Sequence, residues 1–158
     1  MKIIFTFIAA FILFFQSGIE SLRESYAKAN SSNAGTEAFI TMAEKTPGSD
    51  AVIQGYKAAA KIMEAKITKS NRKALVKSGA TSLEAVIKNN PGNAELRVIR
   101  MSVQENIPKI VGYRGSLKED KAFLLNNYNK QNTSLKNYIK RFAAQSKTMT
   151  PAEKAALK

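Results

Sequence analysis

Residues 79–96, GATSLEAVIKNNPGNAEL, contain the end of one helix, a turn and the start of the next helix. Apolar side chains at three- and four-residue steps, such as Leu83 and Ile87, predict an amphipathic helix before the turn. That helix should end just before Pro91, because the residue that precedes a proline disfavours the helical conformation. Asn93 is then suited to accept hydrogen bonds from the free N–H groups of a following helix.

Helical patterns of the same kind continue in both directions, and no segment shows the strict alternation expected of a strand. The pairs Ser116 with Glu119 and Thr150 with Glu153 have the spacing of a capping box. We therefore predict an all-α fold, a compact array of antiparallel helix pairs that forms one domain over residues 19–158. The predicted helices cover residues 19–30, 36–45, 53–67, 75–89, 94–107, 116–128, 135–146 and the segment from 151 onward.

An internal repeat also favours helix pairs. Residues 35–53 align with residues 79–97, and the alignment places Gly35 opposite Gly79 and Pro47-Gly48 opposite Pro91-Gly92. Helix pairs that recur every ~34–47 residues are typical of helical repeat proteins. The alternative is that two unrelated helices both end at a Pro-Gly turn.

Gly79, Leu83 and Pro91 resemble the tail of a tetratricopeptide repeat, which implies a tetratricopeptide-like array over roughly residues 36–106. Arg97 and Arg100 stand where that family commonly has Trp and Leu. A second resemblance covers more of the chain and depends on Gly55-Tyr56, Asn89-Asn90-Pro91 and Gly112-Tyr113. In this order they are similar to a group of small exported bacterial proteins with such a domain and no assigned activity. The resemblance covers about residues 50–128 and implies no catalytic residue.

The composition excludes several classes of active site. The 158 residues include 25 Lys+Arg, 12 Asp+Glu, no His and no Cys, which gives a net charge of +13. Without His and Cys there is no thiolate nucleophile, no histidine-based relay, no ordinary zinc site and no disulfide. We therefore expect neither metal nor cofactor, and we do not expect an enzyme.

The N-terminus has the layout of a secretory signal peptide. Lys2 is followed by an apolar run over residues 3–15 and then by polar residues 16–18. This run is shorter than the ~20 residues that a membrane-spanning helix needs. We predict a signal helix over residues 1–18 and export to the periplasm or cell envelope. The alternative is that the segment is kept as an anchor.

We expect an interaction or scaffold protein that binds an envelope protein or peptide. The candidate partner-binding residues are Tyr56, Arg97, Arg100, Tyr113 and Lys121. Arg97 and Arg100 lie three residues apart, so they share a helix face and could clamp a carboxylate. The alternative for this pair is a structural ion pair, and the acids that could supply it are Glu84, Glu105 and Glu119.

Basic residues also gather without acidic neighbours between positions 121 and 152. The candidate anion-binding residues there are Lys130, Lys136, Lys140 and Arg141. A second basic run covers residues 61–77, opposed only by Glu64. These runs offer two further interpretations of the function. The protein could bind an anionic envelope polymer, a lipid or nucleic acid electrostatically, or it could be a basic holdase chaperone. For an exported protein, envelope polymers and membrane surfaces are favoured over nucleic acid, and plainly solvated helix faces are the remaining alternative.

Overall fold

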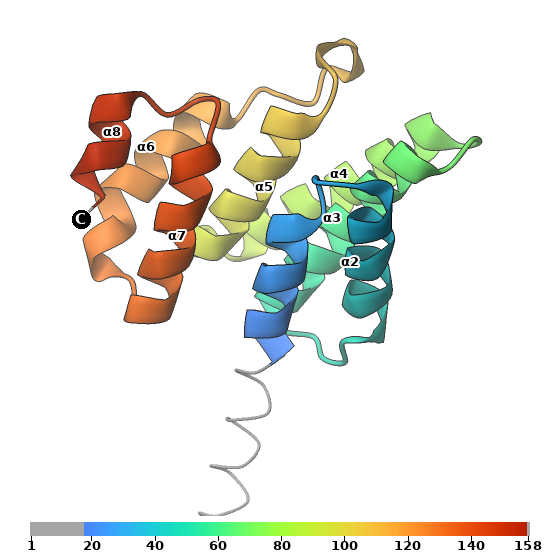
Figure 1. Ribbon diagram of the computed structural model, residues 1–158, viewed down its shortest axis with the longest axis horizontal. Helices are drawn as coiled ribbons and strands as arrows, with labels where there is room; N and C mark the ends of the chain where they lie inside the picture. The colour runs from blue at the N-terminus through green and yellow to red at the C-terminus, as the bar shows by residue number, and fades with distance from the viewer. Residues whose placement is uncertain (1–17, 158) are drawn as a thin grey trace, which may run out of the picture.

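The computed structural model describes residues 18–157, and every regular element in that range is helical (Figure 1). This confirms the all-α prediction, whereas the predicted signal helix falls almost wholly on residues outside the described range. A helix over residues 18–28 comes first. It is followed by α2 (Asn33–Lys45), α3 (Ala51–Ile67), α4 (Arg72–Asn89), α5 (Ala94–Asn106), the 3-10 helix η1 (Lys109–Val111), α6 (Leu117–Asn127), the 3-10 helix η2 (Tyr128–Lys130), α7 (Thr133–Gln145) and α8 (Pro151–Ala156).

Local capping rules explain most of these boundaries. The Asn93 side chain accepts a hydrogen bond from the Leu96 N–H at the start of α5. Thr150 and Glu153 form the predicted capping box at the start of α8. Ser116 precedes α6 as predicted, but its hydroxyl forms no capping hydrogen bond. Its backbone N–H instead donates to Oε1 of Gln104, so a tertiary contact takes the place of the local one.

The central helix α5 lies between two hydrophobic clusters (Figure 1). Its residues from Ala94 to Glu105 are all buried. One side, including Leu96 and Ile99, packs with the helix over residues 18–28 and with α2, α3 and α4. The other side, including Val98 and Met101, packs with α6, α7 and the end of the chain. Every polar side chain on α5 up to Glu105 therefore has to find its partner inside the protein.

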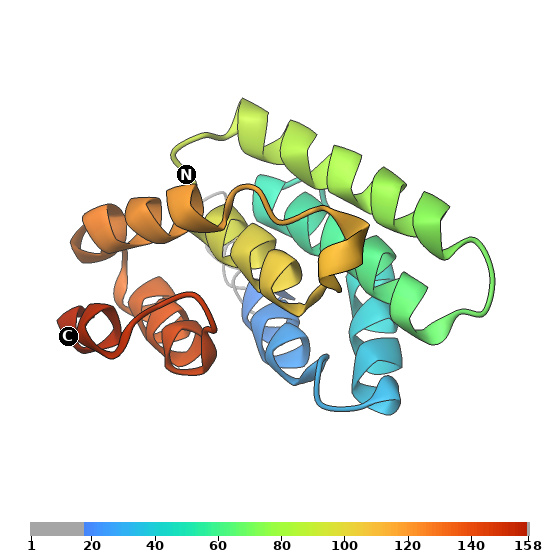
Figure 2. The ribbon, with the colours of Figure 1, turned by 90° about the horizontal axis from the view of Figure 1, so that it is seen from above.

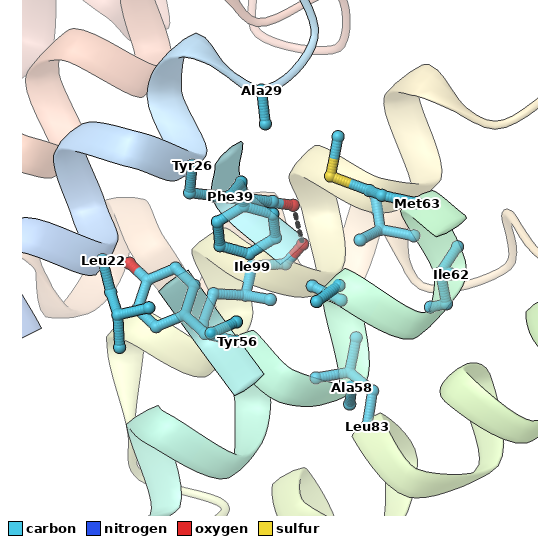
Figure 3. Packing of buried hydrophobic residues seen from close by; sticks show 14 of the residues in the cluster. Leu22, Tyr26, Ala29, Phe39, Tyr56, Ala58, Ile62, Met63, Leu83 and Ile99 are labelled. Carbon is cyan, nitrogen blue, oxygen red and sulfur yellow. Dashed lines mark hydrogen bonds between the residues drawn. The ribbon is translucent and has the colours of Figure 1, made fainter. Parts of the chain in front are cut away.

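Three aromatic rings form the centre of the first cluster (Figure 3). The ring centroid of Tyr26 lies 4.9 Å from that of Phe39 and 5.5 Å from that of Tyr56, in tilted and edge-on arrangements. The Tyr26 hydroxyl donates to the Ile99 carbonyl at 3.3 Å. These contacts hold the first described helix, α2, α3 and α5 together around one point.

Two glycines allow neighbouring helices to approach closely. A Cβ added at Gly79 would lie 2.7 Å from the Ala58 carbonyl oxygen and 2.6 Å from Cγ1 of Ile62. A Cβ added at Gly35 would lie 2.7 Å from the Lys28 carbonyl oxygen. In both places a helix of the chain touches the backbone of the helix before it, where only glycine fits.

We expect Gly79→Val to destabilise the protein by about 2–3 kcal/mol, because α3 and α4 must separate to admit the side chain. Ser78→Val is the matched control, since Ser78 is the exposed neighbour on the same helix and should change stability by less than ~0.5 kcal/mol. Urea unfolding followed by circular dichroism measures both. Equal stabilities of the two variants would contradict the close packing.

Candidate functional site

An open groove of about 1050 Å³ lies among α3, α4, the end of α5 and the connector that follows α5. Its floor is made of apolar side chains from these helices: Ile62, Met63, Ala65, Val76, Ala80, Val103 and Ile107. The end of the first described helix contributes Tyr26 and the turn residue Asn30. The floor therefore combines segments that are as much as 81 residues apart in the sequence, from Tyr26 to Ile107.

Four basic side chains line the groove, and no acidic side chain does. They are Lys66, Arg72, Lys73 and Lys77, all placed at the corner where α3 ends and α4 begins. Within residues 18–157, none of the four forms an ion pair, although Arg72 Nε donates to the Thr68 carbonyl at 2.7 Å and Lys66 donates to the Asn30 carbonyl at 3.5 Å. Unpaired cations beside an apolar floor give the groove a positive potential, which favours a ligand that carries negative charge.

The connector after α5 supplies an apolar lip to the groove. Ile110 is 96% exposed and Val111 is 41% exposed, and both line the groove. They are the exposed large hydrophobic side chains of the described chain. Apolar side chains that project beside an apolar groove mark a surface that a ligand can cover.

The course of the connector explains why the groove is open. After α5, residues 107–116 lead to α6, which packs on α5 within the second cluster. Seen from above, α4 runs along one edge of the first cluster and α6 is directed away from it (Figure 2). The groove-facing side of α4, with Val76 and Ala80, consequently has no covering helix.

Arg97 and Arg100 form buried ion pairs, which was the alternative interpretation of their spacing. Nε and NH2 of Arg100 donate to the two carboxylate oxygens of Asp120 at 2.8 and 2.6 Å. Arg97 NH1 donates to Asp120 Oδ1 at 3.1 Å and to Glu119 Oε1 at 2.6 Å. Burial alone would lower the pKa of Arg100, but the hydrogen bonds and charges of Asp120 and Glu84 raise it above its ordinary value. The pair thus holds α6 against α5.

The same network extends to the groove. Arg100 NH1 donates to Glu84 Oε2 at 2.6 Å, and the Tyr113 hydroxyl donates to Glu84 Oε1 at 2.6 Å. Tyr113 also lines the groove. Glu84 therefore ties α4, α5 and the connector together, and it fixes the wall of the groove on the side of the connector.

The other predicted partner-binding residues lie elsewhere. Tyr56 is fully buried, and its hydroxyl donates to Glu95 Oε1 at 2.8 Å, so it has no surface to offer a partner. Lys121 is paired with Glu153 of α8 at 2.7 Å. Of the five predicted residues, only Tyr113 lines the groove.

The predicted anion-binding residues near the C-terminus are largely occupied by local contacts. Arg141 pairs with Glu24 at 2.5 Å, and this contact raises the pKa of Arg141 and lowers that of Glu24. Lys130 donates to Asn127 Oδ1, and Lys136 lies over the ring of Tyr128. The remaining member of the set, Lys140, is exposed. The run over residues 61–77, in contrast, contributes four of its six cations to the groove.

Buried tyrosines predict a loss of stability at alkaline pH. Burial raises the pKa of Tyr26, Tyr56 and Tyr138 above the ordinary value of 10.0. Above pH 10 the unfolded chain releases these protons while the folded chain keeps them, so the free energy of unfolding falls by about 1.4 kcal/mol per pH unit for each tyrosine. We expect tyrosinate absorbance and loss of helical circular dichroism to rise together above pH 10. Tyr113 adds to the same slope, because burial and its hydrogen bond to Glu84 raise its pKa as well. Tyr138→Phe should therefore reduce the slope by about a quarter, and tyrosinate formation at pH 10 with intact helices would contradict the burial.

The groove was only partly visible in the sequence. The basic run over residues 61–77 is recognisable in the sequence, whereas Ile110 and Val111 fall between the predicted helices over residues 94–107 and 116–128 and stand out by no helical pattern. A pair of large apolar residues in a Gly- and Pro-flanked connector was the available signal, because such residues have no core to enter there.

No three Asp or Glu side chains among the described residues gather closely enough to hold a metal ion. No helix within residues 18–157 is long and apolar enough to cross a membrane. Comparison of the chain with protein-family models, with curated proteins and with solved structures finds no match.

Proposed function

We propose that the protein is an exported helical interaction module without catalytic activity, and that it binds a segment of an envelope protein in the groove. The observation that carries this proposal is the apolar groove with unpaired cations on one rim and exposed Ile110 and Val111 on its lip. If this region were part of the core, Ile110 and Val111 would be buried. A surface that only contacts water would not be expected to place apolar side chains around a groove.

The helix pairing is part of the same proposal. We propose that residues 18–45 and residues 51–89 are two antiparallel, tetratricopeptide-like helix pairs. The aligned glycines Gly35 and Gly79 support this, because each lets its helix touch the backbone of the helix before it, Gly35 beside the turn and Gly79 in the middle of α4. Such pairs stack into arrays that bind partners through their grooves.

Export to the periplasm or cell envelope rests on the apolar run over residues 3–15. A partner in that compartment meets the protein without competing genomic nucleic acid. The second candidate function, binding of an anionic envelope polymer or lipid through the basic rim, is favoured by the four unpaired cations alone and makes no use of the apolar floor.

A photo-crosslinking residue placed at position 110 tests the proposal, since Ile110 is 96% exposed and its replacement disturbs no core contact. We expect it to capture one discrete protein in the native envelope, at low and at high salt. The same residue at exposed Lys118 is the control and should not capture that protein. Val111→Asp should weaken the capture from position 110. If positions 110 and 118 give the same products, the groove is not the binding site.

A further inference from the structure

We infer that the ligand of the groove is an acidic amphipathic helix, which lays its apolar face on the floor and its carboxylates along the rim of α4. This inference rests on the proposed function, because it names the chemistry of the partner that the groove binds. Four features of the groove carry it: its size, the nature of its walls, the spacing of its cations and the position of its lip.

The size of the groove suits a short helical segment. A helix about 10 Å across with a rise of 1.5 Å per residue takes up roughly 120 Å³ per residue. The groove volume of about 1050 Å³ is therefore similar to that of about two and a half helical turns. No strand occurs among residues 18–157, so the described chain offers no sheet edge to an extended peptide. A groove with helical walls and an apolar floor is the usual setting for an amphipathic helix.

The spacing of the cations indicates a row of charges in the ligand. Lys73 and Lys77 lie four residues apart on α4, which separates them by about 6 Å along its axis. Val76 and Ala80, also four residues apart, line the floor beside them. A ligand helix that runs along α4 presents carboxylates at positions i and i+4 with the same spacing. A single anionic head group, in contrast, would be met by cations that converge on one point.

The two sides of the groove differ, and this difference orients the ligand. The basic side chains come from the corner between α3 and α4, whereas Ile110 and Val111 come from the connector after α5. In Figure 1 the connector with η1 rises above the end of α5, at the same end of the molecule as the turn between α3 and α4. A helix in the groove would therefore meet cations along one edge and apolar side chains along the other. A second copy of this chain is disfavoured, because each copy has a net charge of +13.

Synthetic helical peptides of about 16 residues test the inference with the full chain. One peptide carries Leu along one face and Glu at i, i+4 positions along one edge of that face. Two further peptides replace the Glu by Gln or by Lys, and a fourth has the acidic peptide's composition in scrambled order. In fluorescence anisotropy we expect the Glu peptide to bind about tenfold more tightly than the Gln peptide, and the scrambled peptide to bind more weakly than both.

Charge reversal makes the test specific to the rim of α4. Lys73→Glu/Lys77→Glu should weaken binding of the Glu peptide by about tenfold and should strengthen binding of the Lys peptide. Lys45→Glu/Lys118→Glu changes the net charge equally at exposed sites outside the groove and should leave the binding of both peptides unchanged. Circular dichroism of all variants establishes that they are folded.

The outcomes separate this inference from the proposed function. If the Glu and Gln peptides bind equally, the ligand of the groove is not acidic, although the groove can still be a binding site. The same conclusion follows if Lys73→Glu/Lys77→Glu and Lys45→Glu/Lys118→Glu weaken binding of the Glu peptide to the same extent. Capture of a protein from position 110 without binding of any peptide overturns the helical ligand and leaves the proposed function standing. Tighter, Lys73- and Lys77-dependent binding to phosphatidylglycerol vesicles than to the Glu peptide overturns the inference in favour of a lipid head group. The absence of any capture from position 110 overturns the proposed function itself.

Discussion

Asp120→Ala is expected to destabilise the protein by about 3–5 kcal/mol, because it leaves two arginines buried without their common carboxylate. Asp120 is fully buried, and the arginines that it holds are only 8% exposed at Arg97 and 4% exposed at Arg100. The remaining partners of these arginines, Glu119 and Glu84, approach from the solvent side and have side chains 64% and 41% exposed. Chemical denaturation at neutral pH measures the change in the free energy of unfolding.

Glu119→Ala is the matched control for this prediction. Glu119 is the neighbour of Asp120 on α6 and contacts the same guanidinium group of Arg97 at 2.6 Å. Because its side chain is largely exposed, we expect its removal to cost no more than about 1 kcal/mol. Asp120→Asn keeps the shape and loses the charge, and it should fall between the two. If Asp120→Ala and Glu119→Ala destabilise the protein equally, burial of the ion pair does not decide its contribution.

Glu95→Ala is expected to have an effect of similar size, about 3–4 kcal/mol, at the junction of the two clusters. Glu95 is 3% exposed and accepts hydrogen bonds from Nε and NH2 of Arg23 at 2.8 and 2.6 Å, and from the Tyr56 hydroxyl at 2.8 Å. Burial alone would lower the pKa of Arg23, but Glu95 raises it overall through its hydrogen bond and charge. Without Glu95, the buried Arg23 loses the acceptors of Nε and NH2 and keeps the NH1 contacts to Glu20 and Ser134. The buried Tyr56 hydroxyl loses the carboxylate to which it donates.

Glu20→Ala separates the buried partner of Arg23 from its exposed one. Glu20 also pairs with Arg23 at 2.7 Å, but its side chain is 48% exposed, so we expect a cost below about 1 kcal/mol. Tyr56→Phe removes one hydrogen bond to Glu95 and should cost about 1–1.5 kcal/mol. Thermal unfolding of the three variants gives the order of the effects. A Glu95→Ala protein as stable as the Glu20→Ala protein would contradict a clamp formed by Glu95.

The contribution of Glu95 and Asp120 follows from the position of α5. Both carboxylates join α5 to other helices: Glu95 binds Arg23 of the first described helix, and Asp120 of α6 binds the α5 arginines. Because α5 is buried on nearly all sides, these polar groups have little contact with water and depend on one another. The second cluster and the groove are thus held in place by ion pairs as well as by apolar packing.

The sequence by itself determined the helices. Their apolar periodicity, the Asn93 cap, the Pro91 turn and the Thr150–Glu153 capping box act over three or four residues, so they can be recognised without any tertiary contact. The spacing of Arg97 and Arg100 allowed a structural ion pair as the alternative interpretation, and in the structure both arginines form such pairs. Which acids they would find was only partly predicted: Glu84 and Glu119 were among the three candidates, whereas the main partner Asp120 was not.

The tertiary structure alone decided which distant residues meet. Arg23 and Glu95 are 72 residues apart, and nothing local to either residue specifies the other. The predicted capping box at Ser116 is absent: Gln104 accepts from the Ser116 backbone N–H, and Glu119, the expected partner, binds Arg97. The groove, too, depends on α6 packing against the far side of α5, which leaves Val76 and Ala80 of α4 only partly buried. Local rules fix where a helix begins and ends, but the packing of whole helix faces decides which face remains open, and with it the surface that a partner can bind.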